Sequence, residues 1–129
     1  MSEEEGAVSL WVGRAASPEA FSEAVTTAYS EDGDFLSSAF GRAFGLGQYD
    51  EDFQEAERFP DLPRAIEDAL AGFSYYETIA PLFKAIPASA LQDGENCIVL
   101  LYNHRYDGTE SRWSEGSVSL RFVGAVRYR

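Results

Sequence analysis

The sequence has little of three residue types that often carry chemistry: its 129 residues include one cysteine, one histidine and one lysine. A single thiol, Cys97, cannot form an internal disulfide, which excludes a disulfide-stapled scaffold and fits a reducing cytoplasm. No stretch approaches the roughly 18 apolar residues that a membrane-spanning helix requires. The N-terminal stretch "MSEEEG" has neither the basic nor the apolar region of a secretory signal, so we expect a cytoplasmic protein.

Positive charge is scarce as well, with 10 Lys and Arg against 22 Asp and Glu and a net charge of −12. The imbalance is concentrated in the first part of the chain. Residues 1–57 hold 13 acids and two bases, giving −11, whereas residues 58–129 hold nine acids and eight bases, giving −1. A field of this sign opposes binding to nucleic acid and anionic membranes and favours cationic partners.

Apolar residues are plentiful enough for one core, at 45% hydrophobic and 14% aromatic. We expect a flexible acidic tail at residues 1–6 and a single domain at residues 7–129. Hydrophobic periodicity predicts seven elements. In chain order they are strand 7–13, helix 18–29, a short helix within 35–44, helix 62–72, helix 74–86, strand 97–106 and strand 118–128.

Local signals mark where several of these elements begin. Ser17 and Pro18 are the preferred N-cap and first residue of a helix. Ser74 and Glu77 have the spacing of a capping box. Residues 49–59 stay ambiguous, because their apolar positions suit a helical face while their acidic character also suits an edge strand.

The order of the elements predicts an α+β fold: a small antiparallel or mixed sheet with amphipathic helices packed on one face. The run from Cys97 to Tyr102 is apolar at successive positions, which is typical of a strand buried on both faces. We therefore expect Cys97 to be an inert, buried thiol. The strand at 118–128 alternates between apolar and polar residues, so we expect it to be half exposed.

The acidic turns suggest calcium, but their spacing does not fit an EF-hand loop. Such a loop needs an oxygen ligand at positions 1, 3 and 5, glycine at 6 and glutamate at 12. A loop that starts at Asp32 or at Asp50 has a residue other than glycine at its sixth position in both cases. We therefore expect no metal and no cofactor.

Enzyme signatures are also incomplete. The stretch "GFSYY" at residues 72–76 lacks the closing glycine of a serine-hydrolase elbow. His104 follows an apolar run with no serine or cysteine motif beside it, so we interpret it as structural. Gly41, Gly45 and Gly47 do not have the order or context of a phosphate-binding loop. The sequence thus predicts a protein that is not an enzyme, although a small hydrolase using surface carboxylates remains an alternative.

What remains is a surface for a cationic partner, in which carboxylates steer the encounter and aromatic residues anchor it. Tyr49 and Trp113 are aromatic residues that could contribute. Trp11 is interpreted as core, with an interface role as the alternative. The candidate partner-binding residues are Asp32, Asp34, Tyr49, Asp50, Glu51, Asp52, Glu55 and Glu57.

Six short motifs, in order along the chain, resemble the immunity protein 22 family of bacterial polymorphic toxin systems. They are "VSLWVG" at 8–13, "EDGDF" at 31–35, "FG" at 44–45 followed by "YDEDF" at 49–53, "GFSY" at 72–75, "VLLY" at 99–102 and "FVG" at 122–124. The resemblance covers nearly the whole chain from residue 7.

The resemblance implies a small cytoplasmic α+β protein that binds and blocks a cognate toxin delivered by neighbouring cells. Such toxins are frequently nucleases with basic surfaces, which an acidic inhibitor would suit. The family supplies no catalytic residues. A general acidic interaction domain without a toxin partner is the alternative from the same residues.

Overall fold

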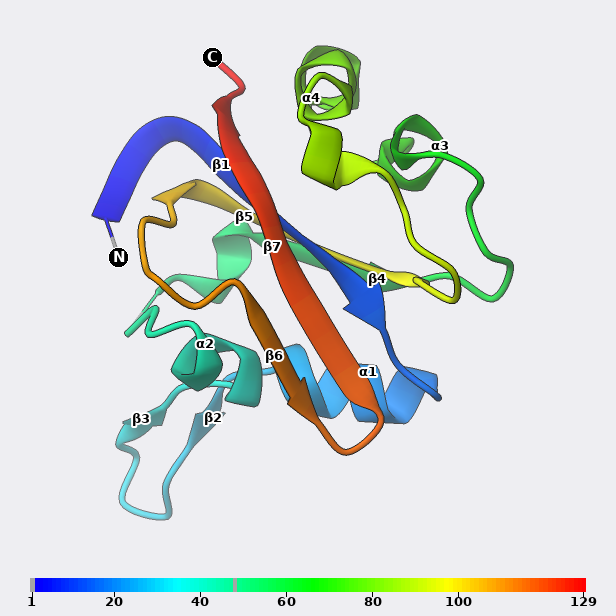
Figure 1. Ribbon diagram of the computed structural model, residues 1–129. Helices are drawn as coiled ribbons and strands as arrows, with labels where there is room; N and C mark the ends of the chain where they lie inside the picture. The colour runs from blue at the N-terminus through cyan, green and yellow to red at the C-terminus, as the bar shows by residue number, and fades with distance from the viewer. Residues whose placement is uncertain (1, 48) are drawn as a thin grey trace.

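The computed structural model describes residues 2–47 and 49–129, which form a sheet flanked by helices (Figure 1). The strands of the sheet are β1 (Ser2–Arg14), β4 (Gln54–Arg58), β5 (Cys97–Arg105), β6 (Arg112–Glu115) and β7 (Val118–Arg127), and a separate hairpin pairs β2 (Ala28–Tyr29) with β3 (Phe35–Leu36). The helices are α1 (Pro18–Val25), α2 (Ala39–Ala43), α3 (Ile66–Leu70) and α4 (Tyr76–Lys84), with 3-10 turns η1 (Glu51–Phe53) and η2 (Pro87–Ser89). None of these helices has the length and apolar content to cross a membrane.

The five-stranded sheet is antiparallel throughout, in the order β4-β5-β1-β7-β6. The expected α+β class is confirmed. The ambiguous segment 49–59 contains the short turn η1 and then β4, an edge strand, so the strand alternative is correct there. β5 lies between β4 and β1, with both of its faces buried from Cys97 to Tyr102, as the apolar run predicted.

Helices cover both faces of the sheet, which corrects the expectation that they pack on one face. Alternate residues of β1 and β5 contribute to two separate cores. One core packs against α3 and α4 and includes Val8, Leu10, Val12, Ile98, Leu100 and Tyr102. The other packs against α1 and α2 and includes Trp11, Cys97, Val99 and Leu101. Figure 1 shows α3 and α4 together on one side of the sheet and α1 and α2 on the other.

β7 changes faces partway along its length, so the expected half-exposed strand is wrong. β1 pairs Leu10 with Gly124 but Trp11 with Phe122, which leaves Val123 as the extra residue of a β-bulge. Before the bulge, β7 packs into the α1–α2 core, and after it into the α3–α4 core. Gly124 allows close packing there, because a Cβ atom at this position would lie 2.8 Å from Ile86 Cδ1.

The expected helices are shorter than their hydrophobic stripes, as α1 and α3 illustrate. α1 begins as predicted, with Ser17 Oγ accepting from the Ala20 N–H at 3.1 Å, but it ends at Val25. The next residues turn into the β2–β3 hairpin, whose pairing offers the backbone an alternative to helix. α3 covers only Ile66–Leu70 of the predicted 62–72.

The predicted capping box at the start of α4 is absent. Tyr75 occupies the N-cap position with left-handed backbone angles, and its side chain makes no capping hydrogen bond. Ser74 instead donates from its N–H and hydroxyl to Glu55 on β4. Glu55 on β4 has therefore replaced the nearby Glu77 as the partner of Ser74.

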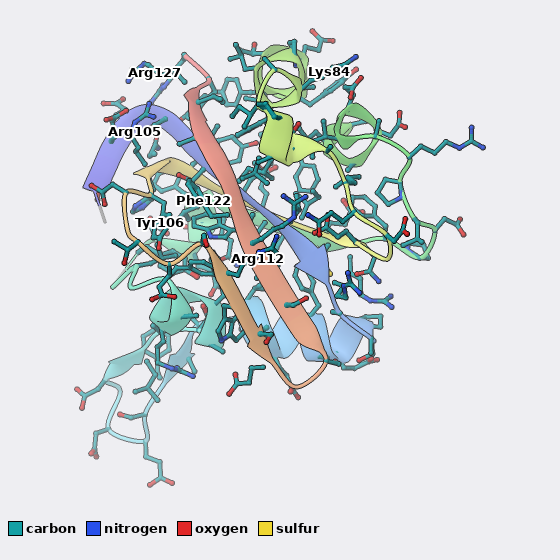
Figure 2. All side chains as sticks on the ribbon, viewed as in Figure 1. Lys84, Arg105, Tyr106, Arg112, Phe122 and Arg127 are labelled. Carbon is teal, nitrogen blue, oxygen red and sulfur yellow. The ribbon has the colours of Figure 1, made fainter. Side chains whose placement is uncertain are left out.

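The acidic N-terminal stretch, assigned from the sequence to a tail at residues 1–6, is part of the sheet from Ser2 onward. Glu3 pairs with His104 in the ladder between β1 and β5. Figure 2 shows Arg105 and Arg127 close to the start of β1. Glu4 forms ion pairs with both, at 3.0 Å and 3.3 Å. These contacts tie the first residues of β1 to the two neighbouring strands.

The buried thiol gives a direct test of the β5 assignment. Cys97 is 2% exposed, and burial raises the pKa of its thiol to about 12, against a smaller opposing effect of the Arg58 charge. We expect iodoacetamide to leave the folded protein unlabelled at neutral pH and to label it fully in urea, because only the thiolate reacts. Rapid labelling without denaturant would contradict the burial of this strand.

Candidate binding site

The expected binding residues lie in separate parts of the structure. Asp32 and Asp34 are exposed at the tip of the β2–β3 hairpin, Asp50, Glu51 and Asp52 are exposed at η1, Glu55 and Glu57 lie on β4, and Tyr49 lies inside. The acidic segment therefore does not form one continuous patch. The η1 and β4 residues come together with parts of the chain that the sequence did not single out.

Tyr49 is a structural residue rather than a surface anchor, which corrects the expectation for it. Its side chain is 6% exposed, and its hydroxyl donates to Gln54 Oε1 at 2.7 Å and lies 3.2 Å from Ser38 Oγ. Burial raises the pKa of the hydroxyl. Tyr49 thus connects α2 to the start of β4 from inside the protein. Trp11 is fully buried as well, as the core interpretation predicted.

Two of the η1 carboxylates organise the local backbone. Asp50 Oδ1 accepts from the Asp52 N–H at 2.9 Å and caps the turn. Glu51 accepts from the Thr27 N–H at 2.7 Å and from the Thr27 hydroxyl, which ties η1 to the end of α1. η1 is therefore held in a fixed place while its carboxylates remain at the surface.

A hollow of about 270 Å³ lies beside η1, where the ends of β5 and β7 meet the segment before α4. We call it the tyrosine hollow, because three tyrosine rings line it. Its lining residues are Asp52, Phe53, Glu55, Ser74, Tyr75, Tyr102, Asn103, Tyr128 and Arg129. It thus combines two of the expected binding residues, Asp52 and Glu55, with an aromatic wall.

The three rings pack on one another. The ring centroids of Tyr75 and Tyr128 lie 4.6 Å apart, those of Tyr102 and Tyr128 5.2 Å, and those of Tyr75 and Tyr102 6.3 Å. Tyr102 and Tyr128 belong to the α3–α4 core, whereas Tyr75 is 53% exposed. The wall therefore has a rigid base and one ring that faces solvent.

Hydrogen bonds fix the two inner tyrosines. The Tyr102 hydroxyl donates to the Ser74 carbonyl and the Tyr128 hydroxyl to Asn103 Oδ1, each at 2.5 Å. Asn103 Oδ1 also accepts from the Gly6 N–H at 3.0 Å, which explains how this strand residue is held. Burial, and then the negative charge of Glu55, raises the pKa of Tyr102, so its hydroxyl stays protonated as a donor.

Two unusual backbone conformations occur at this hollow. Tyr75 and Asn103 have φ values of +60° and +62°, and they are the non-glycine residues with positive φ in the part of the chain that the structure describes. The left-handed region is tolerated by asparagine but costs a tyrosine roughly 1–2 kcal/mol. Such strain is concentrated at functional sites, where surrounding structure maintains it.

The charges around the hollow are unevenly compensated. Glu55 accepts from two neutral donors on Ser74, so its charge has no cation beside it in those contacts. Arg129 pairs with Glu5 at 2.8 Å, and its guanidinium carbon lies 5.5 Å from the centre of the Tyr128 ring. Because Glu5 offsets Arg129, the carboxylates of Asp52 and Glu55 give the hollow a net negative character.

His104, the single histidine, is also buried in the fold. His104 is 4% exposed, its ring centroid lies 6.3 Å from that of Tyr49, and burial lowers its pKa despite the opposing charge of Glu3. This environment fits the structural interpretation of the histidine. Within residues 2–47 and 49–129, no group of three or more His, Cys, Asp or Glu is placed to hold a metal ion.

The sequence contained part of this site but not its assembly. Asp52 and Glu55 were predicted from the clustering of acids, whereas the tyrosines were assigned to a helix start and two strands. The adjacent pair Tyr75–Tyr76, close after Gly72, was a useful signal of an exposed aromatic ring. Two large aromatic residues next to each other at a turn are hard to bury together. The contact between Tyr75 and Tyr128 joins residues 53 positions apart, which local patterns do not report.

The fold and the hollow together define a small α+β domain with a tyrosine-lined recess, which Asp52 and Glu55 also line. A family model described as immunity protein 22 matches residues 8–129. The chain therefore belongs to the immunity protein 22 family, as the sequence motifs indicated. Comparison with curated proteins and with solved structures gives no match.

Proposed function

We propose that this protein is a cytoplasmic immunity protein that neutralises a cognate protein toxin by binding it, without catalysis of its own. The observation that carries the proposal is the family match over residues 8–129. The binding surface that we assign comprises η1, the exposed Glu57 of β4 and the tyrosine hollow. This surface presents Asp50, Asp52 and Glu57 to solvent beside the exposed rings of Phe53 and Tyr75.

The chemistry of this surface suits a toxin with a basic surface, of which a nuclease is the expected kind. A nuclease must attract phosphates with arginine and lysine, and carboxylates on an inhibitor compete for the same cations. Charge of opposite sign steers the encounter and raises the association rate. The exposed aromatic residues of this surface, Phe53 and Tyr75, are anchors of the kind that dominate binding energy.

Co-expression tests the proposed function. The gene beside the one for this protein, where it encodes a protein with a toxin domain, is expressed in the cytoplasm with and without this chain. We expect growth arrest by the toxin alone, rescue by this protein, and a one-to-one complex in size-exclusion chromatography. Arrest that persists despite folded, soluble protein would contradict the proposal for that toxin.

Charge reversals locate the surface. We expect Asp50→Lys with Asp52→Lys to slow association with the toxin about tenfold at low salt, because steering depends on local charge. The double variant Asp32→Lys with Asp34→Lys tests the other acidic location, at the β2–β3 hairpin. The double variant Asp61→Lys with Glu110→Lys is the control, since it changes the net charge equally at exposed positions outside both locations. Stopped-flow measurements compare the three, with circular dichroism to confirm folding. Equal slowing by all three would contradict a localised surface.

A further inference from the structure

The tyrosine hollow has the size of a site for one side chain. Its volume of about 270 Å³ lies just below the roughly 300–1,000 Å³ of ordinary small-molecule pockets. It opens to solvent next to Tyr75, which is 53% exposed, and Phe53, which is 41% exposed. A single protruding residue of a partner could enter it while the rims of the two proteins meet around it.

The wall of the hollow already accommodates a guanidinium group. Arg129 of the same chain lies over the Tyr128 ring, with its guanidinium carbon 5.5 Å from the ring centre. A cation within about 6 Å of an aromatic centroid is attracted by the ring quadrupole. Tyr75 presents a second ring to the same hollow, 4.6 Å from Tyr128, and this ring is the exposed one.

The carboxylates supply the complementary charge. Glu55 is oriented by the N–H and hydroxyl of Ser74, and Asp52 lies on the same lining. The Arg129 charge is offset by Glu5 at 2.8 Å, so an entering cation meets two carboxylates that have no cationic partner in these contacts. A planar guanidinium can stack on a ring and donate in its own plane to carboxylates, which a compact ammonium cannot do equally well.

We propose that the tyrosine hollow binds an arginine side chain of the partner protein, with the guanidinium stacked on Tyr75 and donating to Asp52 and Glu55. This inference rests on the proposed function for its partner, and it names the residue that the partner contributes. The left-handed backbone of Tyr75, with φ of +60°, holds the exposed ring at the mouth of the hollow. A residue kept in a costly conformation to present an exposed aromatic ring fits a recognition role.

Two short peptides test the assignment without any toxin. The ¹⁵N-labelled full chain is titrated with acetyl-Gly-Arg-Gly-amide and, separately, with acetyl-Gly-Lys-Gly-amide at the same ionic strength. We expect saturable shifts of the Ser74, Tyr75 and Asn103 amide signals, with the arginine peptide bound about fivefold more tightly. Absence of saturable shifts at these residues, or equal affinity for both peptides, would overturn the arginine assignment.

Matched variants separate this site from general electrostatics. Glu55→Gln and Glu110→Gln each remove one negative charge, but only Glu55 lines the hollow, whereas Glu110 is exposed elsewhere. We expect Glu55→Gln to weaken binding of the arginine peptide about fivefold and Glu110→Gln to leave its affinity unchanged. Equal weakening by the two variants would overturn the proposal, since it would show attraction to the surface as a whole.

Tyr75→Gly separates recognition from folding. Glycine adopts φ of +60° without strain, and this relief offsets the packing that is lost when the Tyr75 ring is removed from Tyr128, so the melting temperature should change little. We expect it to lose the saturable peptide shifts all the same. Retained peptide affinity in folded Tyr75→Gly protein would overturn the stacking role. Toxin neutralisation without peptide binding would refute only this inference, and peptide binding without neutralisation would refute only the proposed function.

Discussion

Replacing Arg121 with methionine is expected to lower the free energy of unfolding by about 3–5 kcal/mol, because it leaves Glu95 buried without its cation. The two side chains are 8% and 5% exposed. Arg121 Nε and Nη2 donate to the two Glu95 oxygens at 2.7 Å and 2.9 Å, a bidentate arrangement. The same guanidinium donates to the carbonyls of Ala88 and Ala90, so it also holds η2 and the residue after it against β7.

Urea denaturation followed by circular dichroism measures this effect. The comparison requires the same m value, the slope of the unfolding free energy against urea concentration, in the original protein and the variant. The control is Arg112→Met, which removes an exposed arginine of β6, labelled in Figure 2. Arg112 pairs with Arg121 in the ladder between β6 and β7. We expect that variant to change stability by no more than about 0.5 kcal/mol. Similar losses from both variants would contradict the role of the buried pair.

The pair also predicts a dependence of stability on pH. Burial alone would raise the pKa of Glu95, but the Arg121 hydrogen bond, the Gln92 N–H and the charges of Arg121 and Arg14 together lower it below the ordinary value of 4.5. A carboxylate whose pKa is lower in the folded state stabilises the fold above its unfolded pKa. This contribution should be complete above about pH 4.5 and disappear as the pH falls through the lowered pKa. Glu95→Gln should remove this part of the acid dependence.

Replacing Trp11 with alanine is expected to cost about 3–5 kcal/mol, the range for a large aromatic residue removed from a core. Trp11 is fully buried at the centre of the α1–α2 core. Its ring lies 4.9 Å from Phe40 in an edge-on arrangement and 5.3 Å from Phe122, measured between centroids. The variant would therefore leave a cavity between α2 and the sheet, and the neighbouring rings cannot fill it.

A second substitution at this position separates volume from hydrogen bonding. The Trp11 indole N–H is buried and has no hydrogen-bond partner among the described residues. Trp11→Phe removes this donor and retains most of the ring, so it should cost clearly less than Trp11→Ala. Trp113→Ala is the control on β6, where the ring is only partly buried. Equal losses for the alanine variants at the two tryptophans in urea denaturation would contradict the central role of Trp11.

Some elements could be predicted from the sequence because their causes are local. Ser17 and Pro18 start α1 as expected, since a cap and a fixed φ act within one turn of helix. The apolar run from Cys97 to Tyr102 identified a strand buried on both faces, because burial on both sides requires apolar residues at successive positions. The family motifs were equally local, and each is a short stretch of adjacent residues.

Other expectations failed where a distant residue changed the outcome. Arg121 is a polar residue of the strand that was expected to be half exposed, but Glu95 and the carbonyls of Ala88 and Ala90 make its burial favourable. Ser74 was assigned to a capping box, but Glu55 on β4 accepts both of its donors. Sequence patterns assign such polar residues to the surface, which they ordinarily prefer. A correctly placed partner in the folded protein offsets the cost of burying a charge.

The sequence by itself determined the fold class, the buried strand β5, the start of α1 and the family to which the chain belongs. Only the tertiary structure decided that helices cover both faces of the sheet, that β7 changes face at Val123, and that Tyr75, Tyr102 and Tyr128 form one hollow. The physical reason is the distance along the chain over which each interaction acts. Caps and hydrophobic periods act over a few residues, whereas strand register, the bulge and the meeting of the three tyrosines depend on contacts between segments far apart in the chain.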